Sequence, residues 1–164
     1  MRILGIDPGL ERMGYALVDR VGSKLTAIEY GLIKTPQIKL PDRLLLIDAE
    51  LSRILDQFQP EQVATEKLFF AQNKTTALDV SKALGVALLA VGRAGLPWSE
   101  YSPPEIKLSI VGNGSADKRQ VQFMVTKLLG LRETPKPDDV ADALAIAITH
   151  ALRTPAVATA ARNG

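Results

Sequence analysis

The sequence predicts an α/β fold in which helices flank a mixed β-sheet. Two observations support this prediction. Short apolar, β-branched segments open the chain, and longer segments with the apolar spacing of helices then alternate with further short strands. The length of 164 residues fits one domain. We expect that domain to span residues 1–152, with a flexible C-terminal tail over 153–164.

Three consecutive antiparallel strands are expected at the N-terminus. Residues 3–6 and 15–18 are apolar runs separated by the turn cluster Asp7-Pro8-Gly9. Residues 25–33 form a third run, which is rich in β-branched residues and is entered through Gly22-Ser23. A meander is the simplest arrangement of these three strands.

The remainder of the chain alternates helices with short strands. Residues 41–58 have apolar side chains at helical spacing and are followed by Pro60, so they predict a helix. The strand at 63–66 follows this helix, which favours a parallel pairing with the first strand. Ser115 has the character of an N-cap, and Gly130 ends the helix that it opens. The other predicted elements are helices at 76–91, 103–110 and 138–152 and a strand at 97–101.

The composition excludes several classes of protein. The chain has no cysteine, so it has no disulfide scaffold, cysteine nucleophile or Cys-ligated metal. A formal net charge of +2 excludes a polycationic tail protein. No apolar run approaches the roughly 20 residues of a membrane span, and the N-terminus does not resemble a signal peptide. We therefore expect a cytoplasmic protein.

Four acidic residues are candidates for one shared site, and two of them, Glu66 and Asp142, have positions that folding alone does not require. Asp7 and Glu66 end two strands that we expect to be parallel neighbours, so their carboxylates would meet at one edge of the sheet. Asp139 and Asp142 share one face of the last predicted helix, which is otherwise apolar. Carboxylates that converge near a core normally bind a proton or hold cations. Oxygen ligands favour Mg²⁺ or Mn²⁺ over zinc.

Structural roles are the alternative for some of these acids. An Asp before Pro-Gly is commonly a turn residue, and an Asp at a helix start commonly caps the helix or interacts with its dipole. Asp138 also shares a face with Asp142, so helix geometry alone allows Asp138 in place of Asp139.

Four ordered blocks of sequence resemble the RuvC family of Holliday junction resolvases, which has a ribonuclease H-like fold. The blocks are Ile3-Leu4-Gly5-Ile6-Asp7-Pro8-Gly9 with Gly14-Tyr15, Glu66 with Phe69, Val111-Gly112-Asn113-Gly114-Ser115-Ala116-Asp117-Lys118, and Asp139-Val140-Ala141-Asp142-Ala143-Leu144-Ala145-Ile146-Ala147. The resemblance covers nearly the whole chain. It implies that Asp7, Glu66, Asp139 and Asp142 are catalytic ligands of two Mg²⁺ or Mn²⁺ ions per active site. We expect Asp7 to contact both ions, because the turn after it frees both of its oxygens.

The resemblance further implies a homodimeric endonuclease of recombination and repair. Such an enzyme makes paired symmetric nicks in four-way DNA junctions, leaves 5′-phosphate and 3′-hydroxyl ends, and works with the RuvA–RuvB branch-migration complex. A C₂ dimer would match the symmetry of the junction. The helix at 76–91 has apolar and small residues on more than one face, so its outer face is a candidate for the dimer contact or is simply buried in its own domain.

Six residues are candidates for DNA contacts. Lys107, Lys118 and Arg119 flank the glycine loop at 112–114, where basic side chains and free helix N–H groups would bind phosphate. The resemblance suggests that Phe69 stacks on an unpaired base, which leaves Phe70 as a core residue. Asn73 and Lys74 would lie nearby and contact phosphate. Each lysine could instead be an ordinary solvated charge, and so could Arg12.

Three other functions compete with this interpretation. A related RNA-processing nuclease of the YqgF type would share the strand that carries Asp7. A junction-binding scaffold would have no need of four acids. An actin-like or sugar-kinase ATPase also opens with a strand, an acid and a glycine, but it requires two such domains and a longer chain.

Overall fold

A five-stranded mixed sheet forms the centre of the computed structural model, which describes residues 1–68 and 74–155. The strands are β1 (Arg2–Asp7), β2 (Arg12–Val21), β3 (Lys24–Lys34), β4 (Gln62–Glu66) and β5 (Trp98–Tyr101), and their order in the sheet is β3-β2-β1-β4-β5. The first three strands pair antiparallel, whereas β4 runs parallel to both β1 and β5. The predicted mixed sheet is therefore confirmed.

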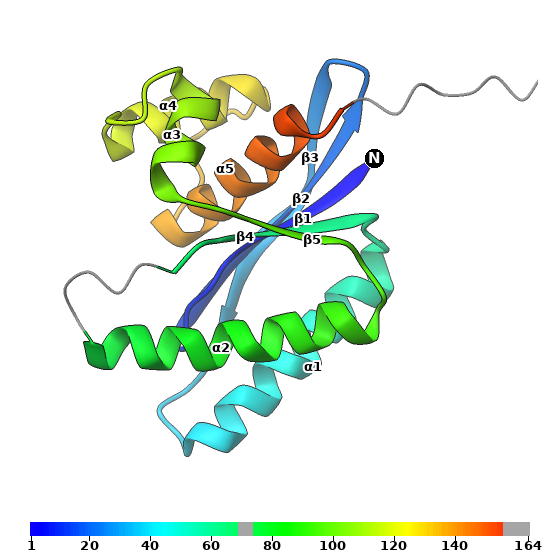
Figure 1. Cartoon of the computed structure of the whole chain (residues 1–164), viewed down its shortest axis with the longest axis vertical. Coiled ribbons are helices and arrows are strands. Elements are labelled where there is room, and N and C mark those ends of the chain that lie inside the picture. Colours follow the sequence, from blue (N-terminus) through cyan, green and yellow to red (C-terminus); the bar gives the residue numbers. More distant parts are fainter. Residues whose placement is uncertain (69–73, 156–164) are drawn as a thin grey trace, which may run out of the picture.

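Helices cover both faces of this sheet (Figure 1). Helices α1 (Leu40–Phe58) and α2 (Lys74–Arg93) lie on one face. Helices α3 (Pro103–Val111), α4 (Lys118–Leu128) and α5 (Asp138–Arg153) lie on the other. No helix within the described ranges is long and apolar enough to cross a membrane.

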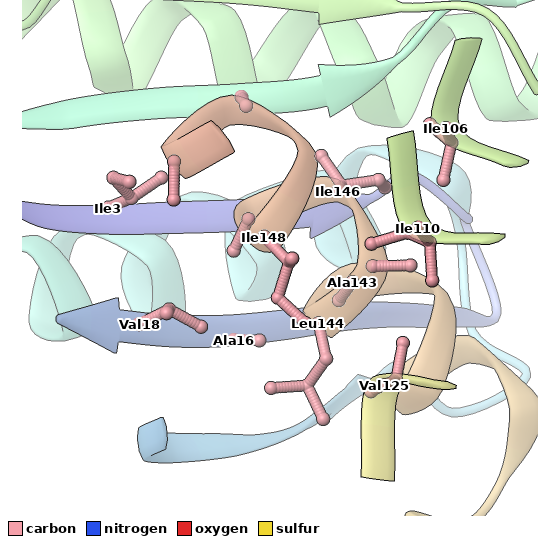
Figure 2. Packing of buried hydrophobic residues seen from close by; sticks show 14 of the residues in the cluster. Ile3, Ala16, Val18, Ile106, Ile110, Val125, Ala143, Leu144, Ile146 and Ile148 are labelled. Atoms are coloured by element: carbon pink, nitrogen blue, oxygen red, sulfur yellow. The ribbon is translucent and has the colours of Figure 1, made fainter. Parts of the chain in front are cut away.

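The alternation of side chains along the central strands divides the core into two clusters. Leu4 and Ile6 of β1 pack toward α1 and α2, whereas Ile3 packs toward α5. Figure 2 shows Leu144, Ile146 and Ile148 of α5 between the sheet and the helices α3 and α4. Because α5 packs against the sheet on one side and against α3 and α4 on the other, these contacts fix its position.

Two glycines allow α5 to lie directly on the sheet. A Cβ on Gly5 would be 2.3 Å from the Ala143 carbonyl oxygen, and a Cβ on Gly14 would be 2.0 Å from the Asp139 carbonyl oxygen. Any larger residue would push the helix away, because real Cβ atoms do not come within 3.0 Å of such atoms. These contacts bring the acidic start of α5 close to the end of β1.

The start of α4 differs from the prediction. Its N-cap is Asp117, whose Oδ1 accepts a hydrogen bond from the Gln120 backbone N–H at 2.8 Å, while the Asp117 N–H donates to Gln120 Oε1. The hydroxyl of Ser115 instead donates to Asn113 Oδ1 within the preceding loop. The prediction of Ser115 as the cap was wrong because this reciprocal capping box places the cap two residues later, at Asp117, so that the helix starts at Lys118.

Four helices extend beyond their predicted ends, α1, α3 and α5 by one residue each and α2 by two residues at both ends. Helix α2 runs from Lys74 to Arg93, and α5 continues through Arg153, where the tail was expected to begin. Arg153 is held there by Glu105, at 2.8 Å from its Nη1 to Oε1. Residues 156–164 of the predicted tail lie outside the described range, so the tail stays a prediction.

Candidate active site

Asp7 and Glu66 lie at the same edge of the sheet, as predicted. Asp7 ends β1 and Glu66 ends β4. The two strands are parallel neighbours in which Ile6 pairs with Thr65, so the next residue of each strand is an acid. Both acids are half-buried. Their carboxylates therefore meet where two central strands end, a position at which open sheets hold ligands.

Helix α5 brings two further acids to this edge. Asp139 and Asp142 are both half-buried, whereas Asp138 is exposed. Gly14 pairs with Asp7 across β1 and β2 and is also the point where the backbone of Asp139 contacts the sheet. The close approach at Gly14 thus places the start of α5 beside Asp7.

The surroundings of these acids disfavour their charged forms. Burial, together with the negative charges of Asp142, Glu66 and Asp139, raises the pKa of Asp7 to about 8. Burial also raises the pKa of Glu66, with Asp142 adding to the effect. The pKa of Asp142 is raised by burial as well, although Lys118 opposes the shift. Carboxylates that repel one another in this way are stabilised by added positive charge.

Two basic side chains already lie against the acids. Lys118 Nζ is 3.1 Å from Asp138 Oδ2 and 3.2 Å from Asp142 Oδ2. Arg12 Nε is 3.5 Å from Asp139 Oδ2. The sequence did not predict that Arg12 would lie beside Asp139. The signal that could have found it is its position two residues before Gly14, the residue that pairs with Asp7.

The donor set of the acids fits a hard divalent cation. All of the candidate ligands are carboxylate oxygens, which Mg²⁺ and Mn²⁺ prefer. Asp139 Oδ2 is buried and accepts no hydrogen bond, so its lone pairs are available to coordinate an ion. As they stand, no three acidic or histidine side chains within residues 1–68 and 74–155 are gathered closely enough to hold a metal. An ion would therefore have to draw mutually repelling carboxylates together.

Two of the acids line a cleft together with two lysines, whereas Asp139 lines a different hollow with Arg12. A hollow of about 200 Å³ is lined by Glu66, Asp142, Lys107 and Lys118, along with apolar residues of α3 and α4. Arg119 instead lines a separate hollow with Asp117 and Phe123, on another face of α4. The structure thus brings Lys107 and Lys118 to the acids but not Arg119.

The remaining predicted DNA contacts lie in or beside a gap in the described chain. Phe69 and Asn73 are outside the described residues, as is Phe70, and Lys74 is the first residue of α2. The segment that leads to Phe69 is anchored, because the Lys67 N–H donates a 2.9 Å hydrogen bond to the Tyr101 carbonyl oxygen.

The single histidine has an internal role. His150 is buried, with Nδ1 2.8 Å from the Tyr101 hydroxyl and Nε2 in contact with Gln62 Oε1. Burial lowers the pKa of its imidazole. Since both ring nitrogens are engaged by protein groups, His150 is not available as a metal ligand.

Acids at the ends of the two central parallel strands lie beside acids on the helix that covers them, which is the arrangement that the resemblance to nucleases with a ribonuclease H-like fold implies. Comparison with known proteins narrows this class. The family model described as crossover junction endodeoxyribonuclease RuvC matches residues 3–150. The chain belongs to this RuvC family, which confirms the resemblance seen in the sequence.

Individual relatives agree with this assignment. The chain is 51% identical over 152 residues to the crossover junction endodeoxyribonuclease RuvC of Desulfitobacterium hafniense, which covers 92% of each chain. It is similar to the structure of T. thermophilus RuvC in complex with Holliday junction substrate, with a TM-score of 0.88, 40% identity and 93% coverage of both chains. The yeast mitochondrial Holliday junction resolvase Ydc2 shares the fold at 17% identity, with a TM-score of 0.67 over 92% of this chain and 78% of that one.

Proposed function

We propose that this endonuclease resolves four-way DNA junctions by metal-assisted hydrolysis, with Asp7, Glu66, Asp139 and Asp142 as the metal ligands. The observation that carries the proposal is the convergence of acids from β1, β4 and α5 on one sheet edge, beside a cleft that also contains Lys107 and Lys118. The junction-bound T. thermophilus relative, at 40% identity, supports the choice of substrate.

Each residue has a defined part in this reaction. When bound, two Mg²⁺ or Mn²⁺ ions supply activation of the attacking water and neutralisation of charge on the departing 3′ oxygen. Asp7 would hold both ions, since it lies between Glu66 on one side and the start of α5 on the other. Lys107 and Lys118, which line the same cleft as Glu66 and Asp142, bind the scissile phosphate. Cleavage leaves a 5′-phosphate and a 3′-hydroxyl.

Other residues would hold the junction around the cut. Phe69 stacks on an unpaired base, and Asn73 and Lys74 contact nearby phosphates. Arg119 is on the outer face of α4, so it would contact a phosphate farther from the cut than those bound by Lys107 and Lys118. These assignments follow the family resemblance together with the place of each residue along the chain.

Two copies of the chain are needed for two symmetric nicks, and the outer face of α2 is our candidate contact. Ala83 and Ala87 are buried inside the domain, so these two small residues of α2 are not part of its outer face. That face instead presents Leu78 and Leu89, which are 56% and 52% exposed, together with Lys82 and Gly85. The RuvA–RuvB complex is the expected partner in the cell, and the cytoplasm the expected location.

The test is cleavage of a synthetic mobile four-way junction in Mg²⁺, Mn²⁺ or EDTA. Linear duplex and an RNA–DNA hybrid serve as alternative substrates, and Asp7→Asn serves as the inactive variant. We expect paired nicks in the junction that require metal and disappear in the variant. Cleavage of the hybrid would instead indicate an RNA nuclease, and tight junction binding without cleavage in either metal would indicate a scaffold.

A further inference from the structure

The two neighbouring acids at the start of α5 have different surroundings. Asp138 is exposed and faces α4, where its Oδ1 accepts a 3.0 Å hydrogen bond from Gln122 Nε2 and its Oδ2 lies 3.1 Å from Lys118 Nζ. Asp139 faces Arg12 at the edge of β2 and has a buried oxygen. Only Asp139 therefore belongs to the half-buried cluster at the sheet edge.

We propose that Asp138 is a positioning residue that holds the Lys118 ammonium at the mouth of the acidic cleft while a divalent cation engages Asp142. This inference rests on the proposed function and adds a residue to it. Asp138 itself touches neither the metal nor the DNA.

The geometry of Lys118 carries the inference. Its ammonium has two carboxylate partners at nearly equal distances, 3.1 Å to Asp138 and 3.2 Å to Asp142. A divalent cation on Asp142 would compete for the same carboxylate and repel the ammonium. With Asp142 as its sole partner, Lys118 would then lose its anchor, and its long flexible side chain would sample many rotamers.

Asp138 supplies a second anchor that a cation in the cleft does not reach. It lies on the exposed side of α5, and Gln122 fixes the orientation of its carboxylate. Lys118 and Gln122 are four residues apart on α4, so they present one face toward Asp138. The ammonium is thus held on the side from which a DNA phosphate would approach.

Helix capping is the competing explanation for Asp138. The N-cap of α5 is Pro137, and no side-chain cap bond is made there. A negative charge in the first turn still interacts favourably with the helix dipole. The two explanations differ in one respect, because only the positioning role acts through Lys118.

The first experiment measures the acylation rate of Lys118 by mass spectrometry in the full chain, with and without Mg²⁺ and without DNA. Exposed Lys24, at the far end of the sheet, is the internal reference. In Mg²⁺ we expect Lys118 of Asp138→Asn to react about threefold faster than in the parent protein, in line with the strength of an exposed ion pair. Glu133→Gln removes an exposed acid from the loop before α5 and should leave the rate unchanged. Equal rates for Lys118 in the parent and Asp138→Asn would overturn the proposal.

Cleavage kinetics supply a second readout. Asp138→Asn should lower kcat about threefold without weakening junction binding, since it removes a negative charge that faces the DNA. In a Lys118→Ala background the same substitution should have no further effect. An equal loss in both backgrounds, together with a lower melting temperature, would assign Asp138 to the helix dipole instead. The acylation experiment is carried out without DNA and needs no cleavage. Its outcome is therefore independent of the Asp7→Asn test of the proposed function.

Discussion

Asp7, a proposed metal ligand, has a carboxylate whose charged form the metal-free fold disfavours. Burial and three neighbouring carboxylates raise its pKa to about 8, against an ordinary value of 3.8. An acid whose pKa is higher in the folded state contributes stability below its unfolded pKa, and that stability is lost as the pH rises through the folded value. Without metal, the stability of the fold therefore falls as the pH rises from about 4 to about 8, and the full cost of charging Asp7 is present above pH 8.

Asp7→Asn should accordingly stabilise the metal-free protein while abolishing cleavage. In EDTA at pH 8 we expect its melting temperature to rise by about 5 °C, because removing the charge should stabilise the fold by about 2 kcal/mol and 1 kcal/mol shifts the Tm of a domain of this size by about 2–4 °C. At pH 4 the two proteins should melt at similar temperatures, because Asp7 is then largely protonated. A variant that melts below the parent protein at pH 8 would contradict the unfavourable charge.

Lys107 offers a test of phosphate binding that is separate from the acids. It lines the cleft with Glu66, and its positive charge opposes the rise in the Glu66 pKa. Lys107→Ala should weaken junction binding in EDTA and reduce the slope of log Kd against log salt by about one. Lys24→Ala, at the opposite end of the sheet, is the matched control. An unchanged slope for Lys107→Ala would remove this lysine from the DNA interface.

At the scale of elements, the site depends on how closely α5 lies on the sheet. Gly5 and Gly14 contact the backbone of α5 directly, at positions where no Cβ fits. The same helix contributes buried residues along most of its length, including Leu144, Ile146 and Ile148 (Figure 2). A shift of α5 would therefore disturb both the core and the placement of Asp139.

Gly14→Ala should move the start of α5 away from β2. A Cβ there would meet the Asp139 carbonyl oxygen at 2.0 Å, so we expect a destabilisation of about 2 kcal/mol or more and a loss of stabilisation by Mg²⁺. Gly92→Ala in α2 meets nothing within 4 Å and should instead stabilise the protein by about 0.5–1 kcal/mol. Urea unfolding with and without Mg²⁺ measures both effects, and equal stabilities for the two variants would refute the steric account.

At the scale of the whole molecule, the exposed side of α2 presents two large apolar side chains away from the core. Leu78 and Leu89 are eleven residues apart, which places them on one face three turns from each other. Their exposure contrasts with the burial of Ala83 and Ala87 on the opposite face. Two chains joined through this face would carry one acidic cleft each.

Leu89→Glu should convert a dimer into a monomer, because a buried charge without a partner is costly in an apolar contact. Light scattering at micromolar concentration measures the mass. Leu45→Glu, which changes an exposed leucine of α1, is the control. We expect single nicks, in place of paired ones, from the monomeric variant. A parent protein that is already monomeric would exclude the dimer.

Much of this protein follows from its sequence because the relevant patterns are local. Alternating apolar residues define the strands. The ends of β1 and β4 place Asp7 and Glu66 side by side, independently of the helices that pack on the sheet. The ambiguity between Asp138 and Asp139 could not be settled in this way. Neighbouring helix residues differ by about 100° around the axis, so the rotation of α5 decides which one faces the sheet.

The sequence by itself determined the α/β class, the family and the four candidate acids. Tertiary packing alone decided how α5 is rotated, through the close contacts at Gly5 and Gly14. It also placed Arg12 beside Asp139, Lys118 between Asp138 and Asp142, and the leucines of α2 outward. These arrangements depend on contacts between residues far apart in the chain, and no local pattern encodes the orientation of one element on another.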